Sequence, residues 1–150
     1  MPAPAAVWHA RCAAAAATVP SDRVALRLAK AQPRAVYDQL DKGELTEYMR
    51  THRAAYDAVI SADTLVYFGS IDEAVGAAHS ALKPRGVLIF TVEAASDEEA
   101  GPDGYRLNKH GRYSHSCAYL ERVLTDAGFS DVTLDSAVLR MESGLPVAGV

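Results

Sequence analysis

The chain has 150 residues, with 15 Lys and Arg against 19 Asp and Glu, a formal net charge of -4 and a pI near 5.7. Its basic residues are scattered, which argues against a nucleic-acid partner, because phosphate binding needs clustered Lys and Arg. The length suits one core-forming domain, and the widely separated Cys12 and Cys117 predict free thiols in a reducing cytoplasm.

The first 20 residues are rich in alanine. His9 and Arg11 interrupt their apolar stretches and there is no basic start, so the segment makes a poor signal peptide and cannot span a membrane. Composition would support a helix over Ala5–Thr18, but no apolar stripe at helical spacing directs its packing. We expect a poorly ordered or loosely docked segment, followed by one domain over residues 21–150.

Short elements open that domain. Pro20 ends the alanine-rich segment, and Ser21 is a good cap for a helix in DRVALRLAKAQ, which ends at Pro33. The pattern then predicts a short strand over Ala35–Leu40 and one or two helical turns over Glu44–Thr51.

Two apolar, β-rich runs dominate the middle of the chain, Asp57–Ser61 and Val87–Val92. Continuous apolar runs of this length are typical of parallel strands buried on both faces. Between them we expect a helix over Ile71–Leu82, opened by a capping box of Ser70 and Glu73. A strand, a helix and a strand in this order predict a right-handed βαβ unit.

A polar loop is expected from Glu93 to Arg112, after which Ser116 caps a helix that Gly128 closes. One face of this helix is apolar, with Leu120, Val123, Leu124 and Ala127. Two further strands, Asp131–Leu139 and Pro146–Val150, are expected to pair antiparallel at the end of the sheet.

From Asp22 to Val150 the chain resembles class I, Rossmann-like S-adenosylmethionine-dependent methyltransferases of the bacterial small-domain type. The resemblance lies in four consecutive blocks: YDAVISADTLVYF, ALKPRGVLIFTVE, GRYSHSCAYLERVLTDAGF and LRMESGLPVAGV. It implies an α/β, three-layer sandwich around a mostly parallel sheet of order 3-2-1-4-5-7-6. The two apolar runs would be the fourth and fifth strands, and the C-terminal antiparallel pair the sixth and seventh.

The chain departs from this family at two points. The Gly-rich loop after the first strand has no counterpart, because Gly43 is the first glycine. Such glycines let the backbone approach a nucleotide, so we expect the N-terminal part of the fold to be incomplete. A missing strand would leave sheet edges unpaired, which predicts a homodimer. Arg85 replaces a glycine in the turn before the fifth strand and is expected to distort it.

The resemblance implies S-adenosylmethionine as cofactor and a small-molecule acceptor. It places six residues around the cofactor: Asp22 at the ribose, Glu44 and Leu45 at the adenine, and Ser61, Ala62 and Asp63 at the methionine end. Each site has a structural alternative. Asp22 suits the first turn of a helix, Glu44 can be a solvated carboxylate beside a buried leucine, and Asp63 can cap the following turn.

An oxygen or nitrogen acceptor also needs a group that takes its proton. The candidates near the expected site are Glu93, Tyr113 and His115, with Tyr67 as a fourth. His115 resembles a recurrent residue of the subfamily, although a histidine before a helix is more often structural, and Glu93 can equally be a solvated strand end.

Two rival functions are weighed against methyl transfer. A metal site of His110, His115 and Cys117 lacks a fourth ligand and matches no zinc spacing, so no metal is expected. The second rival is a non-catalytic protein, either a truncated methyltransferase-like scaffold or a partner module. The glycine-free N-terminus favours this second reading.

Overall fold

The computed structural model describes residues 13–16, 29, 33, 38–142 and 144–150. The chain divides into two units, residues 1–48 and 49–150, each of which is described by itself. The helix expected after Ser21 lies outside the described residues. The predicted domain boundary at residue 20 also lies outside them and stays a prediction.

The first unit contains a two-stranded parallel sheet, in which β1 (Ala13–Ala16) pairs with β2 (Gln39–Lys42). The four alanines are therefore in a strand, and the helix considered for Ala5–Thr18 is wrong at these positions. A short alanine helix without an apolar stripe has no packing to hold it, whereas a strand gains backbone hydrogen bonds from its partner. Helix α2 (Leu45–Thr51) confirms the turns expected after β2.

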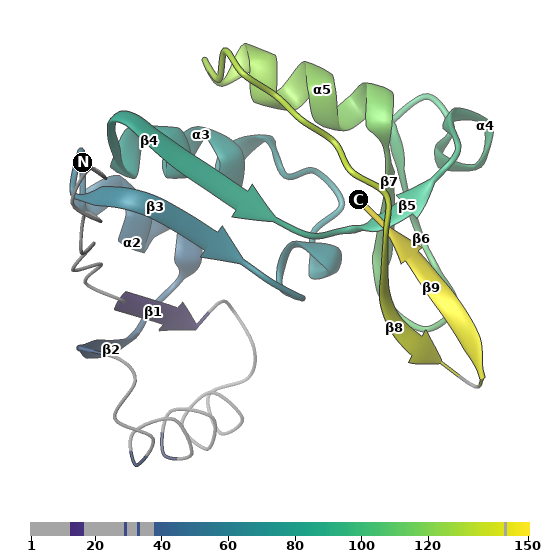
Figure 1. The fold of residues 1–150 in the computed structure, drawn as a ribbon, viewed down its shortest axis with the longest axis horizontal. Helices are drawn as coiled ribbons and strands as arrows, with labels where there is room; N and C mark the ends of the chain where they lie inside the picture. Colours follow the sequence, from purple (N-terminus) through teal and green to yellow (C-terminus); the bar gives the residue numbers. More distant parts are fainter. Residues whose placement is uncertain (1–12, 17–28, 30–32, 34–37, 143) are drawn as a thin grey trace, which may run out of the picture. The chain divides into compact units, whose positions relative to one another are not determined.

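The predicted βαβ unit is confirmed in the second unit. Strand β3 (Tyr56–Ser61) is followed by the 3-10 turn η2 (Leu65–Tyr67) and helix α3 (Asp72–Ala81), and then by β4 (Leu82–Phe90). Strands β3 and β4 are parallel and lie side by side in Figure 1.

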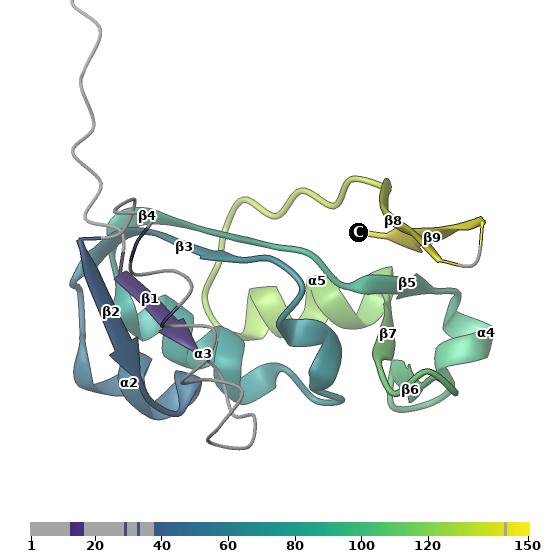
Figure 2. The same cartoon turned by 90° about the horizontal axis from the view of Figure 1, so that it is seen from below.

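The prediction that β3 and β4 are buried on both faces is wrong for one face. Figure 2 shows α3 and α5 on one side of these strands. On the other side Ile60 is 71% exposed, and Val87 and Ile89 are each exposed by half or more. These three side chains and Ala58 form the open face, which no described element covers.

The capping box predicted at Ser70 is also wrong, and the reason is a competing buried partner. The residue before α3 is Ile71, and its amide donates to the Tyr119 hydroxyl at 2.8 Å. That hydroxyl donates in turn to Asp72 Oδ2 at 2.7 Å, and Ser70 Oγ donates to the same oxygen. A tyrosine from α5 therefore satisfies the start of α3, and Glu73 is left at the surface.

The expected polar loop contains three elements that the sequence did not predict: β5 (Glu93–Ala95), α4 (Asp97–Ala100) and β6 (Tyr105–Leu107). Helix α4 is only four residues long. It begins with the capping box that was expected elsewhere, between Ser96 and Glu99.

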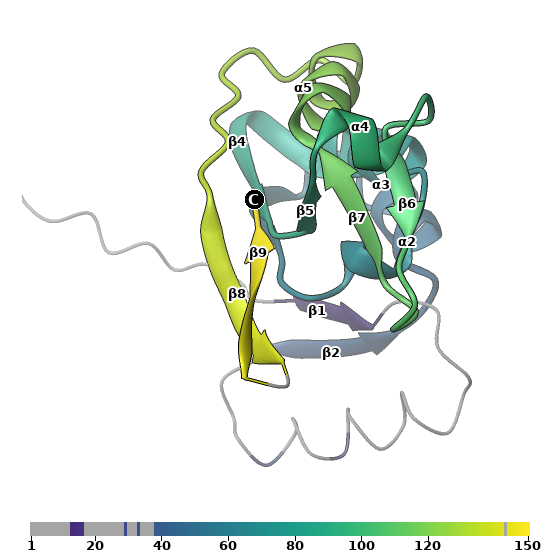
Figure 3. The same ribbon diagram turned by 90° about the vertical axis from the view of Figure 1, so that its right-hand side faces the viewer.

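These pieces join a five-stranded mixed sheet of order β6-β7-β5-β9-β8, visible in Figure 3. Its other strands are β7 (Tyr113–Ser116), β8 (Ala137–Glu142) and β9 (Leu145–Gly149). Strands β8 and β9 form the predicted antiparallel pair, although β8 begins at Ala137 and not at Asp131. Strand β5 is parallel to β7 and antiparallel to β9.

Helix α5 (Cys117–Asp126) confirms its predicted cap and end. Ser116 Oγ accepts from the Tyr119 amide at 3.3 Å, and Gly128 adopts φ 103° just beyond the helix. Its apolar face is buried, with Tyr119, Leu120, Val123 and Leu124. Among the helices of the described residues, none is long and apolar enough to cross a membrane.

Arg85 produces the expected distortion. It has φ 67°, a left-handed conformation that costs a residue with a side chain roughly 1–2 kcal/mol. The pairing of β4 with β3 is irregular here, because Leu82 and Val87 face Tyr56 and Ala58. The segment between Leu82 and Val87 therefore bulges out of the pairing.

Candidate functional site

The first part of the candidate site lies at the carboxyl end of β3. The Thr91 amide donates to the Ser61 carbonyl at 3.1 Å and ties this end to the end of β4. Beyond it the chain turns sharply, with Asp63 at φ 52°. Thr64, and not Asp63, precedes η2, and Thr64 Oγ1 donates to the Ala62 carbonyl. Ligands of open α/β sheets bind at such carboxyl ends.

Two features of this turn suit a ligand. The Ser61 hydroxyl is buried and has no hydrogen-bond partner in the part of the chain that the structure describes. Asp63 and Ala62 are exposed, so the carboxylate of Asp63 is available from solvent. A buried polar group without a partner is rare in native proteins and points to a group that completes it.

Glu44 and Leu45 belong to the first unit, and the turn at Asp63 belongs to the second. The carboxylate of Glu44 accepts from the amides of Thr46 at 3.0 Å and Glu47 at 2.7 Å, so it caps α2. Leu45 is half-buried. The adenine contacts stay a prediction, as does the ribose contact of Asp22, which lies outside the described residues.

Glu93 is a buried carboxylate, 3% exposed, at the start of β5. Its Oε1 binds Arg140 NH2 at 2.5 Å, and its Oε2 lies 3.3 Å from His110 Nε2 and accepts from Asn108 at 3.4 Å. Arg140 also bonds Glu142 at 2.9 Å. The bond to Glu93 raises the pKa of Arg140, and the bond from Arg140 lowers the pKa of Glu142. Glu93 is thus a paired internal charge and not a solvated strand end.

His115 is fully buried in β7. Its Nε2 lies 2.8 Å from the Gly69 carbonyl and must donate, because a carbonyl only accepts. Burial lowers the pKa of His115 below the ordinary 6.5, so the ring is neutral at pH 7, and none of the described residues is a partner of its Nδ1. The ring stacks on Tyr119 at 5.6 Å between centroids. This geometry holds the loop at Gly69 in place.

The two tyrosine candidates differ in their access to solvent. Tyr113 is half-buried and packs edge-on against Tyr105, with ring centroids 6.0 Å apart. Both rings crowd Gly69, where an added Cβ would lie 2.7 Å from the Tyr105 ring. Tyr67 is 52% exposed, and the Arg112 guanidinium lies 5.9 Å from its ring centroid.

The sequence did not indicate the charged partners of this region. Arg140 and Glu142 lie beyond the predicted strand Asp131–Leu139, and Arg112 lies at the end of the expected loop. One signal was present, because Arg140 and Glu142 are two residues apart and such residues share a face of a strand. Nothing in the sequence indicated that Glu93, 47 positions earlier, meets that face.

A metal site does not form from the histidines in this region. His110 lies beside Glu93, His115 donates to Gly69, and Cys117 is a free, exposed thiol. In the part of the chain that the structure describes, no three His, Cys, Asp or Glu residues are arranged to hold a metal ion.

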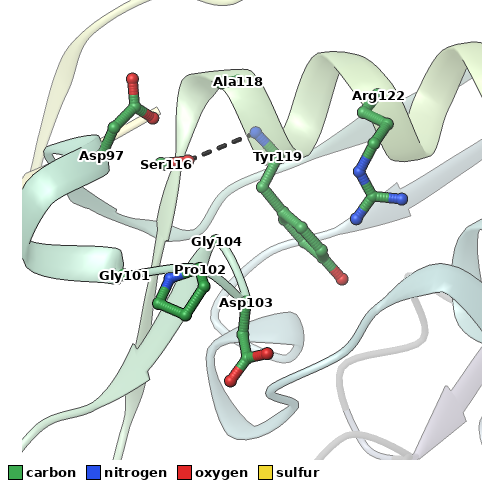
Figure 4. Close-up of a pocket in the computed structure, with 9 residues that line it drawn as sticks. All are labelled: Asp97, Gly101, Pro102, Asp103, Gly104, Ser116, Ala118, Tyr119 and Arg122. Carbon is green, nitrogen blue, oxygen red and sulfur yellow. Dashed lines mark hydrogen bonds between the residues drawn. The ribbon is translucent and has the colours of Figure 1, made fainter.

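A shallow cavity of about 260 Å³ lies elsewhere, between α4, the loop that follows it and the start of α5 (Figure 4). Its lining is Asp97, Gly101, Pro102, Asp103, Gly104, Ser116, Ala118, Tyr119 and Arg122. Two of its polar side chains are already engaged, since Arg122 pairs with Asp72 and Asp126 and Tyr119 donates to Asp72. None of the predicted site residues lines this cavity, so it is not the candidate site.

Comparison with known proteins gives a fold assignment. No family model and no curated protein matches the chain. Among solved structures, a protein of Listeria monocytogenes assigned as an S-adenosylmethionine-dependent methyltransferase matches with TM-score 0.58 and 16% identity, over 81% of this chain and 72% of its own. A methyltransferase of the same kind from Mesorhizobium loti matches with TM-score 0.56 and 17% identity, over 86% and 74%.

A third structure shows how wide the chemistry of this fold is. The cyclase SpnF matches with TM-score 0.58 and 25% identity, over 76% of this chain. The chain spans only 41% of SpnF. One fold therefore carries proteins described as methyltransferases and one described as a cyclase, and function has to be argued from the site.

The described residues fit one end of S-adenosylmethionine. The unpartnered Ser61 hydroxyl can bond a polar group of the cofactor, and the exposed Asp63 carboxylate can pair with its cationic amino-acid end. The strand pairing agrees with the family order, because β3, β4 with its continuation β5, β9 and β8 follow one another as strands four, five, seven and six. The chain has the α/β fold of the class I, Rossmann-like S-adenosylmethionine-dependent methyltransferases.

Proposed function

We propose that the chain transfers a methyl group from S-adenosylmethionine to a small-molecule acceptor at the carboxyl ends of β3 and β4, in a reducing cytoplasm. The observation that carries the proposal is the buried, unpartnered hydroxyl of Ser61 beside the exposed Asp63, on a methyltransferase fold. Ser61, Ala62 and Asp63 then hold the methionine end of the cofactor.

The cofactor supplies an activated methyl group, so the chain has to position the acceptor and provide for its proton. Glu93 and His115 suit positioning, because the first is held by Arg140 and the second donates to Gly69. Tyr67 is the most exposed of the four candidates, and Tyr113, which is half-buried, is the next.

Titration calorimetry of the whole chain with S-adenosylhomocysteine tests cofactor binding directly. We expect a dissociation constant on the order of micromolar, within the range usual for enzyme ligands. A folded chain that shows no heat of binding would contradict the proposal.

The Asp63→Ala variant tests where the cofactor lies. Loss of one charged hydrogen-bonding group corresponds to about 1.5–3 kcal/mol, or roughly 10- to 100-fold in affinity. Asp131→Ala removes another exposed carboxylate, in the loop after α5, and should leave the affinity unchanged. Equal affinities of the Asp63→Ala variant and the unaltered chain would show that the methionine end of the cofactor does not bind at this turn.

One observation favours the alternative of a non-catalytic partner module, namely the open face of β3 and β4. Large apolar side chains on a solvent-facing sheet commonly mark an interface. The open face carries no charge, so a second copy of the chain can meet it without repulsion, and β3 pairs within the described residues only with β4. A homodimer through this edge and face is the corresponding proposal.

A further inference from the structure

Arg112 is a largely buried cation with one buried donor that no described residue satisfies. Its side chain is only 22% exposed, and its Nε is buried without a partner among the described residues. A guanidinium has five N–H donors, yet no hydrogen bond among the described residues uses any of those of Arg112. Among these residues its one ionic neighbour is Glu142, whose Oε2 lies 3.5 Å from NH1.

Glu142 does not complete this cation. Its Oε2 already accepts from Arg140, at 3.1 Å from Nε and 2.9 Å from NH2. Arg140 is therefore the hydrogen-bonded partner of Glu142 as well as of Glu93. The buried Nε of Arg112 is left without a partner among the described residues, and a buried donor without a partner points to a bound group.

The position of Arg112 agrees with a ligand. Its guanidinium lies over the ring of Tyr67, 5.9 Å from the centroid, and that ring is half exposed. Tyr67 ends η2, the turn that directly follows Asp63. A flat aromatic surface and unsatisfied donors are thus adjacent at the edge of the sheet where the candidate site lies.

We propose that Arg112 binds a carboxylate of the methyl acceptor, whose apolar part lies against Tyr67. The planar fork of a guanidinium matches a carboxylate with two parallel hydrogen bonds. A monoanion suits the site better than a phosphate dianion, because Glu142 stands beside the single free guanidinium. As a statement about the acceptor, this inference rests on the proposed function.

The cofactor has a carboxylate of its own at its amino-acid end, so the same chemistry has two sources. The acceptor is favoured because Tyr67 offers a broad ring surface next to Arg112. Separate titrations with a simple carboxylic acid and with S-adenosylhomocysteine distinguish the two sources.

Benzoate is the probe, with benzamide as its neutral match, and binding is followed by NMR on the whole chain without cofactor. We expect saturable benzoate binding that shifts the Arg112 Nε–H signal, and benzamide binding weaker by about tenfold or more, as expected for the loss of one ionic hydrogen-bonded pair. Arg112→Met should weaken benzoate by at least a similar factor. Lys109→Met, in the same hairpin turn, should leave it unchanged.

Three results would overturn the inference. They are equal binding of benzoate and benzamide, equal binding of benzoate by the unaltered chain and Arg112→Met, and inorganic phosphate binding as tightly as benzoate. Should Arg112→Met fail to fold by circular dichroism, Arg112→Lys carries the same test, because lysine keeps the charge and loses the fork.

The S-adenosylhomocysteine arm separates this inference from the proposed function. Unchanged affinity in Arg112→Met supports the acceptor as the source of the carboxylate, and weaker affinity overturns that choice in favour of the cofactor. Benzoate binding by a chain that does not bind S-adenosylhomocysteine at all would leave the carboxylate site standing and the methyl transfer refuted.

Discussion

The two sheets of the second unit differ in which side chains they expose and which they bury. The pair β3 and β4 presents Ile60, Val87 and Ile89 to solvent, although all three are apolar. The five-stranded sheet buries Glu93, a charged residue, to 3% exposure. Side-chain type alone therefore does not decide what is buried, and the difference lies in what the rest of the chain places against each sheet.

On the five-stranded sheet the covering groups are charged partners. Arg140 reaches Glu93 from two strands away in the sheet, and His110 and Asn108 approach it from the hairpin turn. No described element covers the open face of β3 and β4. The buried charge has its partners within the described residues, whereas these residues leave the apolar surface of the other region uncovered.

The largest effect is expected where the buried charge loses its partner. Arg140→Met leaves Glu93 buried without its guanidinium, which should lower the free energy of unfolding by about 3–5 kcal/mol. Urea denaturation followed by circular dichroism measures this change. Adding Glu93→Gln to the same chain removes the stranded charge and should restore a large part of the loss, and a double variant no more stable than Arg140→Met would contradict this account.

A smaller, pH-dependent effect is expected from His115. Its pKa in the folded chain lies below the ordinary 6.5, because the ring is buried, whereas in the unfolded chain it titrates near about 6.5. As the pH falls below that value, the unfolded state takes up a proton that the folded state refuses, so stability falls. Above it this contribution is fully present.

Urea midpoints at pH 7.5 and pH 5.5 measure the effect. The unaltered chain should lose more stability between these values than His115→Gln, which cannot take up the proton. His115→Asn serves as a second replacement of similar polarity. Parallel losses in all three chains would show that His115 does not contribute to the pH dependence.

The smallest effect on stability, and the most direct test of the open face, is expected for Ile60→Lys. The side chain is 71% exposed, so the free energy of unfolding should change by no more than about 0.5 kcal/mol. Self-association should weaken, which light scattering over a range of concentrations would show. Leu145→Lys, at 70% exposure at the start of β9, is the matched control. A mass of one chain at every concentration, before any substitution, would refute the homodimer.

The same contrast explains what the sequence can and cannot predict. The βαβ unit, α5 with its Ser116 cap and the β8–β9 pair follow from local patterns, because apolar periodicity and caps act within a few residues. The prediction for the start of α3 was wrong, because its partner Tyr119 lies 48 positions further along the chain. The pieces β5 and β6 are three residues each, too short to leave a periodic signal.

For the candidate site, the family resemblance supplied Ser61, Ala62 and Asp63, and the structure adds their turn and the unpartnered hydroxyl. The roles expected for Glu93 and His115 depended on exposure, which a sequence does not contain. The burial of Arg112 could not be predicted for the same reason, since an arginine in a polar loop has the same sequence pattern whether it is solvated or buried.

Gly69 can serve to identify more distant relatives that share this local structure. Its carbonyl accepts a hydrogen bond from His115 Nε2, and the space above its Cα is filled by the rings of Tyr105 and Tyr113. Any chain that builds this junction with the same aromatic rings has no room for a side chain at the corresponding position. When candidate relatives are too divergent to align with certainty, an obligatory glycine there, ahead of an α3-like helix, would separate chains that share this arrangement from those that merely share the fold.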